Sequence, residues 1–197
     1  MATVVIPFRS SDPKRRLDGL DAAARADLAH AMLADVLAAA RPLGPVFVVA
    51  AEAPGLPGVE WVDDPHRGQG IAVRAALDAA VAAGSTPPFL VVNADLPCVA
   101  TRDLSALAHA VRVDGLAIAA AQDGTTNALA LSTADLFRPL YGEGSADRFA
   151  ALAPSRRLDA PNLMDDVDTL DDLERLRDRL GVHTRRVLAS LDLQSAA

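Results

Sequence analysis

Acidic residues at two places in the sequence could hold a metal ion or lie beside a phosphate. Asp95 follows the continuous apolar run Phe89–Val92, and Pro97 comes two residues later. This pattern is typical of a strand that is buried on both faces and ends at a turn. Asp166 and Asp168 follow another short apolar stretch much later in the chain. Ligands of open α/β sheets bind outside the carboxyl ends of the strands, so Asp95 lies where a metal or a phosphate could be held.

Basic residues gather in the loop that would follow the first strand. The loop contains Arg9, Lys14, Arg15 and Arg16, relieved only by Asp12, although the chain as a whole carries a net charge of −7. A basic loop in an acidic protein suits a small phosphorylated ligand, which Arg binds through a two-pronged contact and Lys as a point charge. The sequence has no cluster of cysteine or histidine, so the acids favour a hard metal such as Mg²⁺.

This combination of acids and bases suits phosphoryl or nucleotidyl transfer. In such reactions positioning and charge neutralisation supply most of the rate enhancement. The hypothesis is that Asp95, Asp166 and Asp168 hold the metal. The phosphate charge would be taken by Arg9, Lys14 and Arg16. Among these residues, we expect Asp95, Lys14 and Arg16 to be catalytic.

Simpler interpretations of the same acids remain open. Asp95 could do no more than terminate a strand, since acids at strand ends are often structural. The acids of residues 165–168 could be a solvated approach to the last helix, and Asp168 or Thr169 could serve only as its N-cap.

Strands and helices alternate along the first half of the chain, which implies right-handed crossovers and a mostly parallel sheet. Gly124, between two short apolar stretches, fits a hairpin turn that makes the sheet mixed. We therefore predict an α/β protein, a three-layer α/β/α sandwich with a mixed, mostly parallel sheet. The predicted strands are 3–6, 45–50, 59–62, 89–92, 115–121, 126–131 and 163–167, and the main predicted helices are 21–41, 70–83, 101–111 and 170–180, with one more after residue 181.

Polar residues near the starts of helices predict local hydrogen bonds. Ser132 with Asp135 forms a capping-box pattern for a short helix, and Ser145 can cap the next helix. Thr169 with Asp172 forms a second capping box, before a stripe of leucines at helical spacing.

Composition limits the architecture. A length of 197 residues suits a single domain, 1–197, with a real core. Hydrophobic residues make up 51% of the chain but aromatic residues only 4%, so Ala, Val and Leu must build that core. We expect Trp61 to pack in it. Cys98 is the single cysteine, which excludes an intrachain disulfide, and we expect it to be a small buried apolar residue.

Charge and hydropathy restrict the partners. No apolar run approaches the ~20 residues of a membrane span, and the N-terminus begins as a strand without a charged region or cleavage site. We therefore expect a cytoplasmic protein that binds no membrane. A broad basic footprint is missing, which argues against nucleic acid. A homodimer contact could use the apolar residues Val187, Leu188, Leu191 and Leu193.

Five motifs follow one another along nearly the whole chain. They are the basic loop ending in Lys14-Arg15-Arg16-Leu17, the turn Ala94-Asp95-Leu96-Pro97, the segment Gly124–Leu129, the segment Tyr141–Ser145 and the ending Asp166–Thr169. In this order they resemble one family, the 2-phospho-L-lactate / phosphoenolpyruvate guanylyltransferases of coenzyme F-420 biosynthesis. The resemblance implies a nucleotidyltransferase fold that is Rossmann-like and similar to GT-A.

The resemblance also implies roles for single residues. It makes Asp95 the metal-binding acid of the Asp-Leu-Pro turn and Asp166 and Asp168 the second part of a Mg²⁺ site. The residues implied to hold a phosphorylated three-carbon acid are Thr126, Gly142 and Ser145, with Arg148 near the place where archaeal-type members carry a histidine. The residues assigned to GTP are Arg9, Lys14 and Arg16 in the basic loop, and Gly68 and Gly70 near the base.

The implied reaction transfers GMP from GTP to the phosphate of phosphoenolpyruvate or 2-phospho-L-lactate and releases pyrophosphate. The bacterial look of the composition favours phosphoenolpyruvate, and 3-phosphoglycerate stays open. An acceptor phosphate is already ionised at neutral pH, so no general base is needed. Two alternatives are a nucleotidyltransferase for a molybdopterin or a sugar phosphate, which expects a glycine that residues 8–16 lack, and a catalytically silent nucleotide-binding module.

Overall fold

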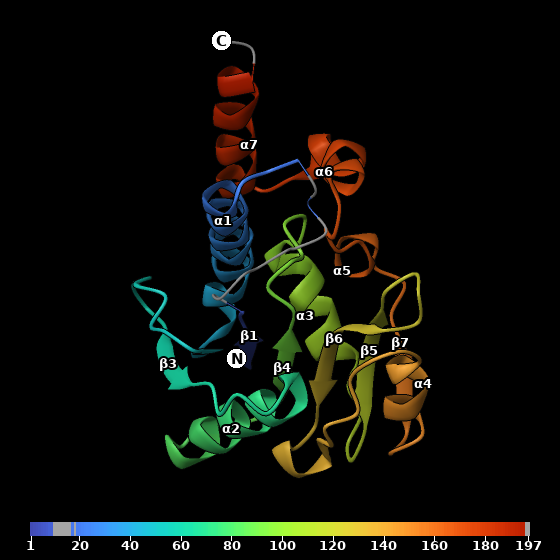
Figure 1. The fold of residues 1–197 in the computed structure, drawn as a ribbon. Coiled ribbons are helices and arrows are strands. Elements are labelled where there is room, and N and C mark those ends of the chain that lie inside the picture. The colour runs from blue at the N-terminus through green and yellow to red at the C-terminus, as the bar shows by residue number, and fades with distance from the viewer. Residues whose placement is uncertain (10–16, 18, 196–197) are drawn as a thin grey trace.

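A mixed sheet forms the middle layer of the part that the computed structural model describes, residues 1–9, 17 and 19–195 (Figure 1). Its strands are β1 (Thr3–Pro7), β2 (Val46–Ala50), β3 (Glu60–Asp63), β4 (Phe89–Val92), β5 (Leu116–Ala120), β6 (Thr126–Leu131) and β7 (Ser155–Arg157). They lie in the order β3-β2-β1-β4-β6-β5-β7. β1 to β4 are mutually parallel, β6 is antiparallel to both β4 and β5, and β7 is parallel to β5. The predicted mixed, mostly parallel sheet is confirmed.

Helices connect the strands and cover both faces of the sheet. The α-helices are α1 (Ala22–Ala40), α2 (Gln69–Ala82), α3 (Thr101–Ala110), α4 (Ser145–Ala150), α5 (Pro161–Met164), α6 (Leu170–Leu176) and α7 (Val182–Ser195). Short 3-10 turns are η1 (Arg41–Leu43), η2 (Ala134–Leu136) and η3 (Arg177–Arg179). One face of the sheet packs against α1, α3 and α5, and the opposite face packs against α2 and α4. The three-layer sandwich is therefore confirmed, with a core built mainly from Ala, Val and Leu.

A third apolar cluster joins the C-terminal helices to α1. Its buried members are Leu17, Leu28, Met32, Cys98, Val167, Leu173, Leu176, Leu180 and Leu188. Burial raises the pKa of Cys98 to about 11, so the thiol is neutral at physiological pH, as expected of a small core residue. The cluster continues into α7, which lies against α1 and extends away from the sheet to the C-terminus (Figure 1).

A buried carboxylate on α1 caps the start of α7. Asp35 is 5% exposed, and its two oxygens accept hydrogen bonds from the backbone N–H groups of His183 and Thr184, each at 2.9 Å. The first N–H groups of a helix lack partners inside the helix, so a carboxylate there satisfies them and complements the helix dipole. Gly181 makes room for it, because a Cβ at that position would lie 2.2 Å from Asp35 Cγ. The Gly181 N–H also donates to the carbonyl of Pro97 at 2.7 Å, which ties α7 to the turn after Asp95.

One predicted strand is wrong. Residues 161–164 form α5, and residues 165–168 form a loop, where the sequence predicted a strand over 163–167. Pro161 starts the helix because its fixed φ and missing N–H suit the first helical position. β7, in contrast, was missed because Ser155-Arg156-Arg157 has no apolar pattern, and the strand is an exposed edge.

Two of the predicted helix caps are also wrong. The Ser132 hydroxyl accepts from the Gly115 N–H at 3.0 Å, and only the 3-10 turn η2 follows it, with Thr133 as N-cap. Ser145 is the first residue of α4, and the N-cap is Gly144 with φ +66°. The capping box of Thr169 with Asp172 at the start of α6 is confirmed.

One expectation about an apolar side chain is wrong, and the dimer contact stays a prediction. Trp61 is 45% exposed on the edge strand β3, where its indole N–H donates to the Ala50 carbonyl, so its expected place in the core is wrong. Of the residues considered for a dimer contact, Leu188 is buried within the chain, and Val187 and Leu191 pack partly against the same cluster. Among the helices that the structure describes, none is long and apolar enough to cross a membrane.

We expect Asp35→Ala to lower the free energy of unfolding by about 1–3 kcal/mol, because two N–H groups lose their acceptor. Gly181→Ala should cost at least as much, since its new methyl group overlaps the Asp35 carboxylate. Part of that cost should vanish in the double variant. Urea denaturation measures all three, with Asp27→Ala, exposed on the same helix, as the control. Fully additive losses would contradict the proposed contact.

Candidate functional site

Three carboxylates meet beyond the carboxyl end of β4. Asp95, Asp166 and Asp168 are each half-buried, and one oxygen atom from each lies within 4.8 Å of the others. Asp95 comes from the turn after β4, and the other two come from the loop between α5 and α6. The structure thus brings together the three acids that the sequence assigned to a metal. We name them the carboxylate cluster.

A backbone hydrogen bond joins the two segments that supply the cluster. The Val167 N–H donates to the carbonyl of Asp95 at 3.1 Å. The Val167 side chain is fully buried in the cluster of apolar residues between α1, α6 and α7. Asp166 and Asp168 flank Val167 in the sequence, so one buried residue holds both of them beside Asp95.

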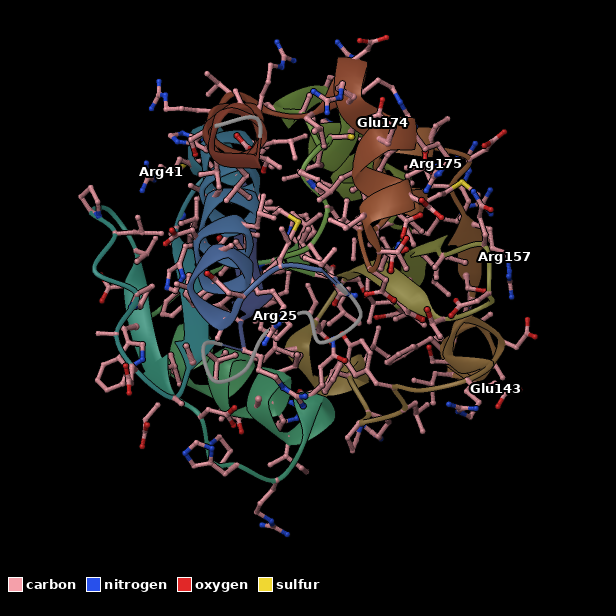
Figure 2. All side chains as sticks on the ribbon, turned by 45° about the horizontal axis from the view of Figure 1, so that its top comes forward. Arg25, Arg41, Glu143, Arg157, Glu174 and Arg175 are labelled. Atoms are coloured by element: carbon pink, nitrogen blue, oxygen red, sulfur yellow. The ribbon has the colours of Figure 1, made fainter. Side chains whose placement is uncertain are left out.

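An ion-pair group fixes the loop on the other side. The Asp165 carboxylate accepts from Arg175 of α6 at 2.9 Å, from Arg179, and from Gln122 at 3.2 Å (Arg175 is labelled in Figure 2). Burial opposes the ionisation of Asp165, but the hydrogen bonds from Arg179 and Arg175 outweigh it, so the pKa of Asp165 lies below its usual value. Asp165 therefore anchors the loop and remains ionised at neutral pH.

A β-bulge in β6 changes the face of the sheet to which Thr126 and Asn127 point. Ala119 pairs with Ala128 but Ala120 pairs with Thr126, which leaves Asn127 as the extra residue. The Asn127 amide donates to the Met164 carbonyl at 3.2 Å and to Asp166 Oδ1 at 3.3 Å, on the face of α5. Bulges are frequent beside active sites because they re-aim side chains in this way.

Thr126 is directed to the other face. Its hydroxyl lies 3.0 Å from that of Ser145 in α4, and both residues are buried. Gly142, just before α4, has φ +109°, a conformation that favours glycine. The structure therefore brings Thr126 next to the segment Gly142–Ser145, so the three residues that the resemblance assigned to the acceptor acid lie close together.

Arg148 has a different environment from the expected anion ligand. Its guanidinium donates to three carbonyls of the loop before α4: Leu140 at 2.9 Å, Glu143 at 2.6 Å and Tyr141 at 3.4 Å (Glu143 is labelled in Figure 2). These contacts hold the loop before α4 in its conformation. The anion-binding role of Arg148 stays a prediction.

The start of α2 lies beside β4. Gly68 is the N-cap of α2 with φ +91°, and the side-chain amide of Gln69 donates to Asn93 Oδ1 at 2.9 Å. Gly70 allows close packing, because a Cβ there would lie 2.5 Å from the Cβ of Pro139. The backbone conformation at Gly68 and the packing at Gly70 thus each favour glycine, apart from any role toward a nucleotide.

The basic loop is described only at its start. Arg9 is exposed, two residues after the end of β1. Lys14 and Arg16 lie outside the described residues. Their assignment to the nucleotide stays a prediction.

Sequence reasoning missed the amides Gln69, Asn93 and Asn127. Asn127 is 2% exposed within an apolar strand, and an amide in such a run is the signal that could have identified it, since a buried polar group needs partners. Asn93 could have been noticed two residues before Asp95.

A small pocket of about 160 Å³ adjoins the carboxylate cluster, with Asp166 and Asp168 in its wall. The rest of its lining is Ala121, Gln122, Asp123, Met164, Asp165, Asp172 and Arg175. Carboxylates dominate the lining, so the pocket and the cluster together form a strongly negative region.

Burial and neighbouring charge act together on Asp166. Burial raises the pKa of Asp166, the Asp95 charge raises it further, and the Asn127 hydrogen bond opposes both effects. Two unit charges 4.8 Å apart repel by about 3.5 kcal/mol at an effective dielectric constant of about 20. This repulsion opposes the assembly of the cluster, and a bound cation would offset it.

Comparisons with known proteins point to one family. The family model described as "Guanylyl transferase CofC like" matches residues 2–193. A 2-phospho-L-lactate guanylyltransferase of Halobacterium salinarum is 37% identical over 175 residues, covering 86% of this chain and 81% of the relative. Phosphoenolpyruvate guanylyltransferase 2 of Rhodococcus jostii is 32% identical over 195 residues, covering 95% and 90%. A crystal structure from Desulfovibrio desulfuricans G20, described as a nucleotide-diphospho-sugar transferase, has the same fold, with a TM-score of 0.76 at 16% identity and coverage of 98% and 95%.

We expect Asp166→Asn to stabilise the metal-free protein near pH 7.5 by about 1 kcal/mol, because one charge leaves the cluster while an oxygen remains to accept from Asn127. The sign follows from the raised pKa of Asp166. Its charge costs stability above that pKa, and the cost fades as the pH falls through it toward the value of an unfolded aspartate.

The advantage of the variant should therefore shrink between pH 7.5 and about pH 4, the ordinary aspartate value. Thermal unfolding in EDTA at several pH values measures it. Asp171→Asn, an exposed acid of α6, is the matched control and should change little. A variant less stable than the parent chain at neutral pH would contradict the raised pKa of Asp166, whose causes are burial and the Asp95 charge.

Proposed function

The chain belongs to the family of CofC-like guanylyl transferases, and from this membership we propose that it transfers GMP from GTP to the phosphate of phosphoenolpyruvate. It is an enzyme, a guanylyltransferase, whose reaction serves coenzyme F-420 biosynthesis. The observation that carries the proposal for the site is the meeting of Asp95, Asp166 and Asp168 at the carboxyl end of β4. The family favours this reaction over transfer to a molybdopterin or sugar phosphate and over a silent binding module.

Phosphoenolpyruvate is our choice of acceptor. The relatives carry two names, one for phosphoenolpyruvate and one for 2-phospho-L-lactate. The phosphoenolpyruvate guanylyltransferases of Rhodococcus jostii and Conexibacter woesei align with 95% and 90% of this chain, against 86% for the Halobacterium relative. Both acceptors offer the same chemistry to the site, an ionised phosphate beside a carboxylate. An assay with each acid in turn, described below, is therefore needed to separate them.

The donor set of the cluster fits a hard divalent cation. All three donors are carboxylate oxygens, within 4.8 Å of one another. Two ligands of one Mg²⁺ ion lie at most about 4.2 Å apart, since each is about 2.1 Å from it. Small side-chain movements would bring all three acids to that spacing, so we propose that they hold Mg²⁺. When bound, the ion supplies positive charge to the phosphate oxygens of GTP and pyrophosphate.

The remaining groups are proposed to hold the two substrates. Arg9, with Lys14 and Arg16 of the same loop, would bind the triphosphate, and the start of α2 with Gly68 and Gly70 would face the nucleotide. The acceptor would lie against Thr126, Gly142 and Ser145. A hydrogen bond between two hydroxyls uses one O–H group, so the other hydroxyl of the Thr126–Ser145 pair can donate to an anion.

The reaction itself needs little from the protein beyond position. An oxygen of the acceptor phosphate forms a bond to the α-phosphorus of GTP, while the bond from that phosphorus to the bridging oxygen breaks and pyrophosphate leaves. The attacking oxygen is already ionised at neutral pH, so the chain need supply no general base. Binding both substrates in line at the carboxylate cluster is then the main catalytic task. An enzyme that consumes GTP in this way would work in the cytoplasm.

We expect purified protein to release pyrophosphate from GTP and Mg²⁺ when phosphoenolpyruvate is offered, and less or none with 2-phospho-L-lactate or 3-phosphoglycerate. Asp95→Asn should lower kcat by about 10³-fold or more, because the charge at the centre of the cluster is lost. The far-ultraviolet circular dichroism of the variant should match that of the parent chain. Asp171→Asn again serves as the control and should keep full activity.

Turnover only with 2-phospho-L-lactate would change the acceptor and keep the reaction. Turnover with none of the three acids by folded protein would overturn the proposal. An active Asp95→Asn variant would remove Asp95 from the metal site.

A further inference from the structure

We propose that Asn127 is a positioning residue for Asp166, and that a chain of side-chain amides, Gln69–Asn93–Asn127, fixes its orientation from the start of α2. The inference rests on the proposed metal-binding role of the cluster. It adds residues outside the carboxylates and links the nucleotide side of the site to the metal side.

The first step is that Asn127 is buried and that both ends of its side-chain amide have polar partners. The residue is 2% exposed. Its amide nitrogen donates to the Met164 carbonyl at 3.2 Å and to Asp166 Oδ1 at 3.3 Å, while its amide oxygen faces Asn93 Nδ2 at 3.5 Å. A carbonyl and a carboxylate can only accept, so chemistry alone sets which end of the amide points to Asp166.

The second step is that the bulge in β6 lies at Asn127, where the contact with Asp166 needs it. Along β6, Ala128 and Ala130 face α1 and α3, whereas Leu129 and Leu131 face α2 and α4. Strict alternation would put Asn127 with Leu129, away from the carboxylate cluster. The extra residue shifts the alternation, so Asn127 faces α5 and Asp166.

The third step is that hydrogen bonds from Asn93 and from Gln69 of α2 fix the orientation of the Asn127 amide. Asn93 donates through Nδ2 to the Thr126 carbonyl at 3.3 Å and toward Asn127 Oδ1, and its own Oδ1 accepts from Gln69 Nε2 at 2.9 Å. The Asn93 backbone N–H also donates to the Asn127 carbonyl at 2.9 Å. Gln69 donates to Asn93, Asn93 donates to Asn127, and Asn127 donates to the Asp166 carboxylate. Reversing any one amide would place two donors or two acceptors face to face.

The consequence concerns how the cluster is arranged before a cation binds. Mutual repulsion pushes the three carboxylates apart, and Asp166 can turn about its side-chain bonds. A hydrogen bond to Oδ1 restricts that rotation and leaves the other acceptor positions for the cluster. Partners of this kind, which hold a metal ligand from behind, typically change metal affinity by 10-fold to 100-fold when removed.

The test measures metal binding directly, with Mn²⁺ as the probe and without nucleotide. Electron paramagnetic resonance reports the free Mn²⁺ in a titration of the whole chain. We expect Asn127→Ala to raise the Kd for Mn²⁺ about 10-fold, and Asn93→Ala to raise it less. The double variant should bind like Asn127→Ala alone, because Asn93 acts through Asn127.

The matched control is Asn162→Ala. Asn162 lies on α5 close to the cluster, and its amide bonds to Asp103 and Arg179 and not to a cluster carboxylate. It should keep the Kd of the parent chain within about twofold. In turnover, Asn127→Ala should raise the Mg²⁺ concentration needed for half-maximal rate, while the KM for the acceptor stays unchanged and kcat at saturating Mg²⁺ largely recovers. If Asn127 only stabilised the fold, its loss would not raise the Mg²⁺ requirement while leaving the KM for the acceptor unchanged.

The outcomes separate this inference from the proposed function. If Asp166→Asn loses Mn²⁺ but Asn127→Ala binds it like the parent chain, the cluster holds metal and the positioning role is overturned. If the effects of Asn93→Ala and Asn127→Ala multiply, the amide chain is overturned. If Asn127→Ala does not fold, Asn93→Ala replaces it in the test. An unchanged Kd for Mn²⁺ in Asn93→Ala then overturns the proposed series of amides. A parent chain that binds no Mn²⁺ overturns the metal role itself, and this inference with it.

Discussion

The structure depends on holding three negative charges together at one edge of the sheet. Repulsion among Asp95, Asp166 and Asp168 works against folding, so other contacts must help to bring their segments together. One backbone hydrogen bond, from Val167 to Asp95, makes the junction, and the buried Val167 side chain supports it. The α1–α6–α7 cluster therefore supplies the apolar burial that the acidic loop itself cannot provide.

The same arrangement divides the work among the elements. The apolar strands β1 and β4 form the rigid base, which precise sites require, and the loops above them carry the functional groups. On one side Arg175 and Arg179 neutralise Asp165, so the loop has a charged anchor next to the carboxylate cluster. On the other side one neutral amide, that of Asn127, donates to Asp166. A neutral donor can orient a metal ligand without competing for its charge, whereas an arginine there would take the place of the cation.

Sequence reasoning could find the parts whose signals are local. The run Phe89–Val92 followed by Asp95 and Pro97 predicts a buried strand with an acid at its end, and β4 confirms that strand. Residues 163–167 misled because Leu163 and Val167 are both buried, but one lies on a helix and the other in a loop. The amide of Asn127 in an apolar strand could have marked it as a residue that needs partners, but the face to which it points could not be predicted, because the bulge depends on the pairing of β5 with β6. The meeting of residues 95 and 166–168 is a long-range event. Acids after two apolar stretches suggested a shared metal site, and the family resemblance supported it, but no local pattern fixes the contact.

The contact between Gly70 and Pro139 bears on how sequence variation in this family should be interpreted. A glycine at the start of a helix beside a nucleotide site is commonly explained by the close approach of a phosphate. Here a side chain at position 70 would overlap Pro139 whether or not a nucleotide is bound. Evolution can therefore keep this glycine for packing alone. Invariance at position 70 would carry no information about the substrate, whereas a change there should be accompanied by a change at position 139.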